Sequence, residues 1–74
     1  MKELLKQHLL QLLRHHLDRW SEFEISIIDL AHYLCFATSF GYYVPNAINR
    51  SIEELKREGL IKCDRLLNGY YFYK

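Results

Sequence analysis

Five polar side chains between positions 46 and 57 have the chemistry needed to hydrogen-bond to nucleic-acid bases. They recur at intervals of three and four residues, so on a helix they would share one face. An asparagine amide can form two hydrogen bonds with adenine, and an arginine guanidinium can form two with guanine. The spacing therefore predicts one helix face whose side chains are chemically suited to contact DNA bases. Its residues are Asn46, Asn49, Arg50, Glu53 and Arg57.

The same face has a second interpretation, as an ordinary solvated helix surface. Arg50 with Glu54, and Glu53 with Arg57, are pairs of opposite charge four residues apart, each worth roughly a few tenths of a kcal/mol in an isolated helix. The three basic residues of this segment are also balanced by Glu53, Glu54 and Glu58. The residues alone leave both interpretations open.

The overall charge of the chain does not by itself favour nucleic acid. Ten lysines and arginines against nine acidic residues give a net charge of +1, whereas nucleic-acid-binding domains are typically strongly basic. Up to Tyr43 there are four basic and five acidic residues, and after it six and four. Within that more basic part, Lys62, Arg65 and Lys74 are candidates for phosphate contacts, which fix register without recognising sequence.

Hydrophobic periodicity predicts the elements that would position these side chains. From residue 2 to residue 20, leucines and Trp20 recur at helical spacing over an arc of about 160°, which predicts a first helix. Ser26, with Asp29 three positions later, is close to a capping box and predicts a second helix over about 27–37.

A third helix is predicted over about 45–58. Pro45 suits its first turn, because the missing N–H of proline would be unpaired there in any case. Gly59 is expected to end it in the left-handed conformation. The buried stripe of this helix is expected to contain Ile48, Ile52 and Leu55, with Ala47 and Ser51 beside them.

Strand signals occupy the rest of the chain. Ser21–Ile25 alternates polar and apolar residues, as a short strand or an extended link would. Leu60–Leu67 and Tyr70–Tyr73 flank Asn68-Gly69, a dipeptide that favours a two-residue type I′ turn in a hairpin. That turn would place Leu67 opposite Tyr70, and Arg65 opposite Phe72.

This order of elements is that of a winged helix, the hairpin-bearing variant of helix-turn-helix domains. The segment from Asn46 to Ile61 resembles the recognition helix of winged-helix regulators, which ends in a leucine, a few charged residues and Gly-Leu-Ile. Leu30-Ala31 with Leu34 is similar to the second helix of that family, and Tyr70–Tyr73 resembles the returning wing strand. One departure from the family is that twelve residues lie between Leu34 and Ala47, more than the usual tight turn has. A longer second helix, or a packed loop over Phe36–Tyr43, would account for the extra residues.

The resemblance implies one α+β, mainly α domain over residues 1–74: a three-helix winged helix-turn-helix with a C-terminal two-stranded β-hairpin wing over about 60–74. It implies a transcriptional regulator that binds double-stranded DNA as a homodimer, with the third helix on the bases and the wing on phosphate. Small stand-alone domains of this kind resemble regulators of viruses, plasmids and mobile elements. Some winged helices are instead protein–protein adaptors that bind no nucleic acid, and this alternative stays open.

The first helix is a candidate dimer interface. Its apolar arc is wider than the roughly 100° stripe that a surface helix buries, so we expect it to meet both its own core and a partner subunit. The alternative is a first helix fully buried by the rest of the chain. Leu66 and Leu67 at the hairpin tip are also unusually apolar, and would contact a partner, enter a minor groove or be buried by the hairpin. The candidate interface residues are Leu4, Leu5, Leu9, Leu12 and Leu13.

Other classes of function have little support in the sequence. The four histidines do not combine with cysteines at zinc-site spacing, and His16 is expected to be a partly buried imidazole on the apolar side of its helix. No nucleophile elbow, glycine-rich phosphate loop or paired carboxylates are present, so we expect no enzyme, no cofactor and no small-molecule substrate. The chain has no run of eighteen apolar residues, and Cys35 and Cys63 are expected to stay reduced, which favours a cytoplasmic protein without a membrane partner.

Overall fold

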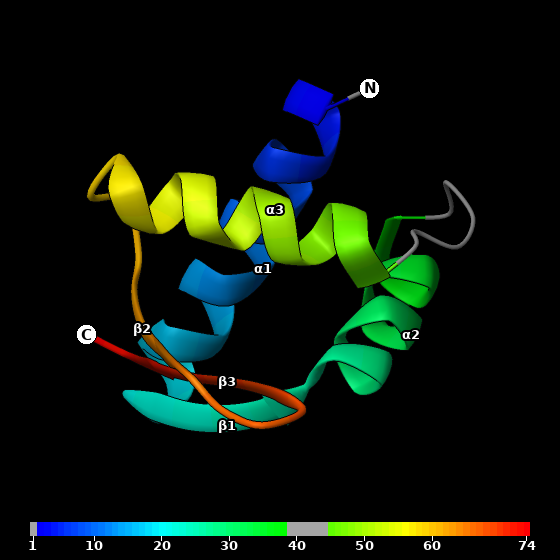
Figure 1. Ribbon diagram of the computed structural model, residues 1–74. Helices are drawn as coiled ribbons and strands as arrows, with labels where there is room; N and C mark the ends of the chain where they lie inside the picture. The colour runs from blue at the N-terminus through cyan, green and yellow to red at the C-terminus, as the bar shows by residue number, and fades with distance from the viewer. Residues whose placement is uncertain (1, 39–44) are drawn as a thin grey trace.

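The computed structural model describes residues 2–38 and 45–74 as three helices and a three-stranded antiparallel sheet, a mostly helical α+β fold (Figure 1). The first helix has the expected bounds, the second ends one residue later than expected, and the third ends one residue earlier. The expectation for a loop over Phe36–Tyr43 falls largely on residues 39–44, outside the described residues; α2 itself extends to Thr38. The elements are α1 (Lys2–Trp20), β1 (Glu22–Ser26), α2 (Ile27–Thr38), α3 (Pro45–Arg57), β2 (Lys62–Arg65) and β3 (Gly69–Tyr73).

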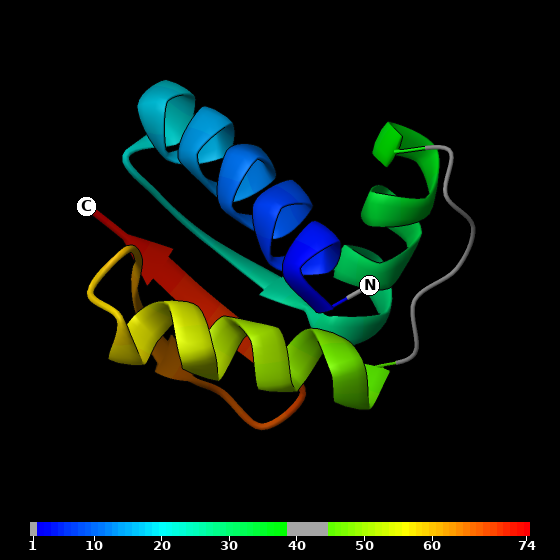
Figure 2. The ribbon, with the colours of Figure 1, turned by 90° about the horizontal axis from the view of Figure 1, so that it is seen from above.

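The last strand is the middle strand of the sheet. The order is β1-β3-β2, and both neighbours run antiparallel to β3. Side chains of a strand alternate between its two faces, and in β3 Tyr70 and Phe72 are buried whereas Tyr71 and Tyr73 are only half-buried. The buried face is covered by helices, and in Figure 2 β3 is seen between α1 and α3.

One apolar core joins the helices to this sheet face. Most residues that periodicity predicts are buried in it, and α3 buries Ile48, Ile52 and Leu55 as expected. Trp20, predicted on the apolar arc of α1, is instead exposed. Because a single leucine is worth roughly 1.5–3 kcal/mol when buried, these stripes hold the helices in place. The other buried apolar residues are Leu5, Leu9, Leu13, Leu17, Ile27, Leu30, Ala31, Leu34, Ile61, Cys63, Tyr70 and Phe72.

Both local signals for helix ends are confirmed. The backbone N–H of Asp29 donates to the hydroxyl of Ser26 at 3.1 Å, so Ser26 caps α2. Gly59 has a φ of 77°, and its N–H donates to the carbonyl of Lys56 at 3.0 Å. The N–H of Leu60 donates to the carbonyl of Leu55 at 3.0 Å, which completes a Schellman motif.

The predicted hairpin register is wrong. Arg65 is paired with Tyr70 rather than with Phe72, and the N–H of Leu66 donates to the carbonyl of Gly69 at 2.9 Å. The two-residue turn therefore consists of Leu67 and Asn68, not of Asn68 and Gly69.

The position of Gly69 in the sheet explains this difference. Gly69 pairs with Ser26 of β1, and a Cβ atom there would collide with the carbonyl oxygen of Ile25. The glycine is needed where β3 passes close to β1, so it lies in the strand and the turn moves one position towards the N-terminus.

Candidate nucleic-acid interface

The structure brings the five predicted base-contacting residues of α3 onto one side of the helix. Asn46, Arg50 and Arg57 are exposed, and the isoleucine stripe points in the opposite direction, into the core. Together with Glu54, the five residues line a shallow depression of about 410 Å³. The sequence prediction for this face therefore agrees with where the side chains lie.

Within this face, Asn49 and Glu53 lie nearer to the body of the protein. Both are half-buried, and the side-chain oxygen of Asn49 is buried without a hydrogen-bond donor among the described residues. At 100° per residue, Asn49 is turned about 60° from Asn46 around the helix axis. Asn46, Arg50 and Arg57 are therefore the side chains best placed to meet a ligand, and Asn49 and Glu53 form the border of the face.

The acidic residues of this segment are partly neutralised from another helix. Nζ of Lys6, on α1, lies 2.9 Å from Oε2 of Glu58 and 3.8 Å from Oε2 of Glu54. The Lys6 side chain is only 11% exposed, so it is held between α1 and α3. Two of the three glutamates that balanced the basic residues in the sequence are thus paired with a lysine on α1.

Both arginines of the face are consequently available. Within residues 2–38 and 45–74, neither Arg50 nor Arg57 forms an ion pair, so the expected pairs Arg50–Glu54 and Glu53–Arg57 are not formed. Glu53 is the remaining carboxylate on the face. The five predicted residues of this face therefore present two guanidinium groups and one carboxylate.

The three basic residues predicted on the wing do not form one patch. Lys62 is exposed, but strand alternation puts it on the sheet face opposite to that of Arg65. Arg65 lies over the ring of Tyr70 at 5.3 Å and donates to its hydroxyl at 3.3 Å. Lys74 lies 4.0 Å from Asp18 on α1. Of these three residues, Lys62 is thus the one without an ion pair or ring contact among the described residues.

The structure corrects part of the expected dimer interface. Leu5, Leu9 and Leu13 are buried in the core of their own chain and have no surface for a partner. Leu4 and Leu12 are half-buried, and Leu12 packs against the same core. Contacts of α1 with α3 and with the sheet account for the wide apolar arc of this helix within one chain.

Lys6 is a residue beside the candidate site that sequence reasoning missed. Its position, directly after the buried Leu5, gave no signal of its role. The contact with Glu54 and Glu58 depends on how α1 crosses α3, which the periodicity of either helix does not encode. No local signal could have found it, because the three glutamates of this segment are matched in number by its own three basic residues.

The histidines and cysteines show no ligand site. The ring of His16 is half-buried, as expected, with Nδ1 3.1 Å from the carbonyl oxygen of Leu12 and the Tyr33 ring 4.9 Å away. In the parts of the chain that are described, no three His, Cys, Asp or Glu side chains gather where they could hold a metal ion. Cys35 and Cys63 are free thiols, and burial raises the pKa of the Cys63 thiol.

Comparisons of the chain with protein-family models, with curated proteins and with solved structures found no match. Among the helices described here, none combines the length and hydropathy needed to cross a bilayer. The fold and the α3 face are therefore the observations that bear on the function of the chain.

Proposed function

We propose that the chain is a winged-helix protein that binds double-stranded DNA, with the outer face of α3 in the major groove. The observation that carries the proposal is the pairing of Lys6 with Glu54 and Glu58. Because these two carboxylates are held towards α1, Arg50 and Arg57 remain exposed without an ion-pair partner in the described residues. A merely solvated helix would be expected to use those arginines in pairs along its own surface.

The architecture supports this orientation of α3. The apolar stripe of the helix is buried, so the polar face is turned outward, and a β-hairpin follows directly in the chain. Three helices followed by a hairpin on an antiparallel sheet are compatible with a winged helix-turn-helix.

On this proposal, each side chain has a chemical role. Asn46 and Arg50, near the start of α3, would contact base edges, since recognition helices approach bases with their N-terminal residues. The carboxylate of Glu53 would accept a hydrogen bond from cytosine, and Arg57 would contact guanine or a phosphate. Lys62 would contact phosphate, and Arg65 and Lys74 would do so after leaving Tyr70 and Asp18.

A homodimer on a two-fold-related DNA site is part of the proposal. Two copies would double the phosphate contacts of a chain whose own net charge is only +1. With Leu5, Leu9 and Leu13 buried, the interface must use other side chains. On this proposal the DNA-bound dimer is a cytoplasmic transcription regulator.

The second candidate is a protein–protein adaptor. It is favoured by the near-neutral charge and by the separation of the wing cations, because DNA-binding surfaces usually concentrate basic residues in one patch. The two candidates differ in salt dependence. DNA affinity falls as counterions compete for phosphate, whereas an adaptor surface has no such behaviour towards duplexes.

The test is the binding of a labelled random-sequence duplex, followed by selection of preferred sequences. For three phosphate contacts from each chain of the dimer, affinity is expected to fall by about three orders of magnitude between about 50 and about 200 mM salt. Arg50→Ala is expected to weaken binding to a selected site by about 1–3 kcal/mol without unfolding the chain. Arg14→Ala, an equal loss of charge at an exposed position of α1, is the matched control. Absence of duplex binding, or equal effects of the two variants, would remove the proposed role of α3.

A further inference from the structure

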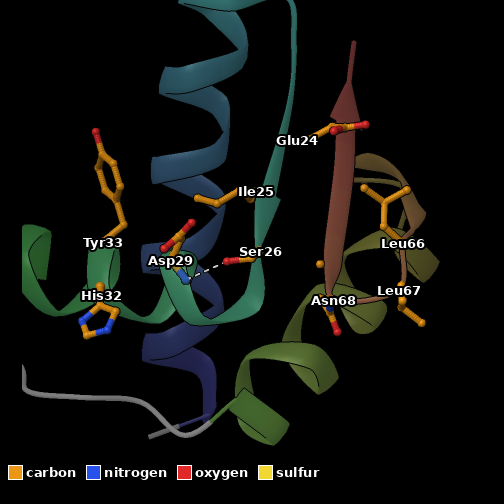
Figure 3. A pocket seen from close by; sticks show the side chains of 10 residues that line it. Glu24, Ile25, Ser26, Asp29, His32, Tyr33, Leu66, Leu67 and Asn68 are labelled. Atoms are coloured by element: carbon orange, nitrogen blue, oxygen red, sulfur yellow. Dashed lines mark hydrogen bonds between the residues drawn. The ribbon is translucent and has the colours of Figure 1, made fainter.

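A groove opens between the start of α2, strand β1 and the tip of the β2–β3 hairpin. In Figure 3, His32 and Tyr33 stand on α2 at one side, Leu66 and Leu67 on the hairpin at the other, and β1 runs between them. None of its lining residues belongs to the α3 face. The groove is lined by Glu24, Ile25, Ser26, Asp29, His32, Tyr33, Leu66, Leu67, Asn68 and Gly69.

The backbone fixes the shape of this groove. The carbonyl of Asn68 accepts a 2.9 Å hydrogen bond from the N–H of Ile27, the first residue of α2, so the hairpin tip is tied to the helix start. The absence of a side chain at Gly69 lets β3 lie directly against β1 at this point. The groove is therefore formed by paired backbone rather than by a free loop.

Large apolar side chains stand exposed along this groove. Leu67 is 95% exposed and Tyr33 47% exposed, and Leu66 is also exposed. Ile28, on the first turn of α2, adds a further exposed apolar side chain next to the lining residues. Such a gathering at a hollowed surface is characteristic of a site that binds another molecule.

The charges around the groove have one sign. Glu24 and Asp29 are exposed carboxylates in its lining, and none of the described residues that line it is a lysine or an arginine. A second copy of the groove packed against the first would gather four carboxylates in one interface, and DNA phosphates would be repelled by them. The matching ligand is apolar and positively charged.

We propose that this groove binds a segment of a partner protein in which apolar side chains alternate with, or lie next to, lysine or arginine. The apolar side chains of the segment pack against Leu67, Leu66 and Tyr33. Its cationic groups pair with Glu24 and Asp29 at the groove. The chain then has two independent surfaces, one on α3 for DNA and one at the hairpin tip for a basic peptide segment.

The test uses a labelled ten-residue peptide in which leucine and arginine alternate, titrated with the whole chain by fluorescence anisotropy. Two comparison peptides replace every arginine with glutamate or every leucine with serine. The leucine–arginine peptide is expected to bind at least ten times more tightly than either. Amide chemical shifts of the labelled chain are expected to change at Ile25, Leu66, Leu67 and Gly69 and to stay constant on α3.

Variants assign the effect to the groove. Glu24→Lys and Leu67→Ser are each expected to weaken peptide binding at least fivefold, because one reverses a lining charge and the other removes an exposed apolar contact. Asp18→Lys makes the same charge change on α1 and is expected to change affinity less than twofold. Thermal unfolding of each variant shows that it is folded.

Three results of the peptide-binding experiments would overturn the inference. These are equal binding of the glutamate peptide, shift changes located away from the groove, and an effect of Asp18→Lys as large as that of Glu24→Lys. A chain that dimerises in sedimentation, and loses its dimer in Leu67→Ser, would assign the groove to a second copy and overturn it as well. Glu24→Lys is also tested for duplex binding, where the groove proposal expects no loss of affinity. Failure of the groove proposal can therefore be distinguished from failure of the α3 proposal.

Discussion

The ammonium group of Lys6 donates a 2.9 Å hydrogen bond to Oε2 of Glu58, joining residues 52 positions apart in the sequence. The same nitrogen lies 3.8 Å from a carboxylate oxygen of Glu54. One lysine on α1 thereby partly neutralises Glu54 of α3 and Glu58 just beyond it, which lowers the negative charge beside the α3 face.

Lys6→Met should weaken duplex binding although Lys6 lies outside the α3 face. Methionine keeps much of the apolar stem and removes the charge, so the two carboxylates would add negative charge beside Arg50 and Arg57. We expect a stability loss of about 0.5–1 kcal/mol and a lower duplex affinity, measured by urea unfolding and by anisotropy. Lys56→Met, an equal loss of charge on the exposed side of α3, provides the comparison for affinity. Unchanged affinity in Lys6→Met would mean that the pairing does not set the charge of this face.

Gly69→Ala should destabilise the fold by about 1–3 kcal/mol, because the added Cβ meets the backbone of Ile25 and Ser26, which cannot move aside as a side chain would. Gly59→Ala is the matched comparison. No atom lies near its Cβ position, and its cost of about 1–2 kcal/mol comes from the positive φ alone. Asparagine tolerates this conformation better than alanine, so Gly59→Asn should recover part of the loss whereas Gly69→Asn should not. Urea unfolding of the four variants measures this, and recovery by Gly69→Asn would contradict the collision.

Leu9→Ala should destabilise the chain by about 2–5 kcal/mol, because Leu9 is fully buried in the core of its own chain. Leu12→Ala, on the half-buried flank of the same helix, should cost less. If Leu9 belonged to a dimer interface instead, the effect of its removal would vary with protein concentration. Thermal unfolding at two concentrations distinguishes these cases, and a concentration-dependent effect would contradict the burial seen here.

Stability should fall in alkaline solution. Burial raises the pKa of the Cys63 thiol above its ordinary 9.0 and that of the Tyr70 phenol above its ordinary 10.0, while Lys56 and Arg65 act in the opposite direction. The folded state therefore retains protons that the unfolded chain releases. The contribution of these groups is complete below their ordinary pKa values and is lost as pH rises through the raised ones.

Urea unfolding at about pH 7.5 and about pH 10.5 measures this dependence. Tyr70→Phe removes one of the two groups, so its free energy of unfolding should vary less over the same interval. An equally steep dependence in Tyr70→Phe would show that Tyr70 does not contribute.

Local signals in the sequence predicted the helices well. Ser26 and Gly59 act through hydrogen bonds and backbone angles within a few residues, so their effects can be read without knowing the rest of the fold. The isoleucine stripe of α3 is likewise local, and it correctly predicted that Asn46, Arg50 and Arg57 are exposed, whereas Asn49 and Glu53 are half-buried.

Features that depend on two distant segments could not be predicted in this way. Asn68-Gly69 is a strong hairpin signal, but the approach of β1 to β3 decides how Gly69 is used. The burial of Leu5, Leu9 and Leu13 depends on what covers both sides of α1, and the pairing of Lys6 depends on a helix crossing. The proposed function rests on such a non-local feature, because a residue of α1 partly neutralises the acidic residues beside the α3 face.

The place of β3 between the other two strands affects the order in which the domain can form. β1 is made early in synthesis but has no strand to pair with until β3, the last described strand, has been made. Until then α1 and α3 lack Tyr70 and Phe72, two of the largest buried side chains of the core. A nascent chain halted before residue 69 would leave leucine-rich helices uncovered, so the domain is expected to fold in one late step and to depend on chaperones when synthesis stalls.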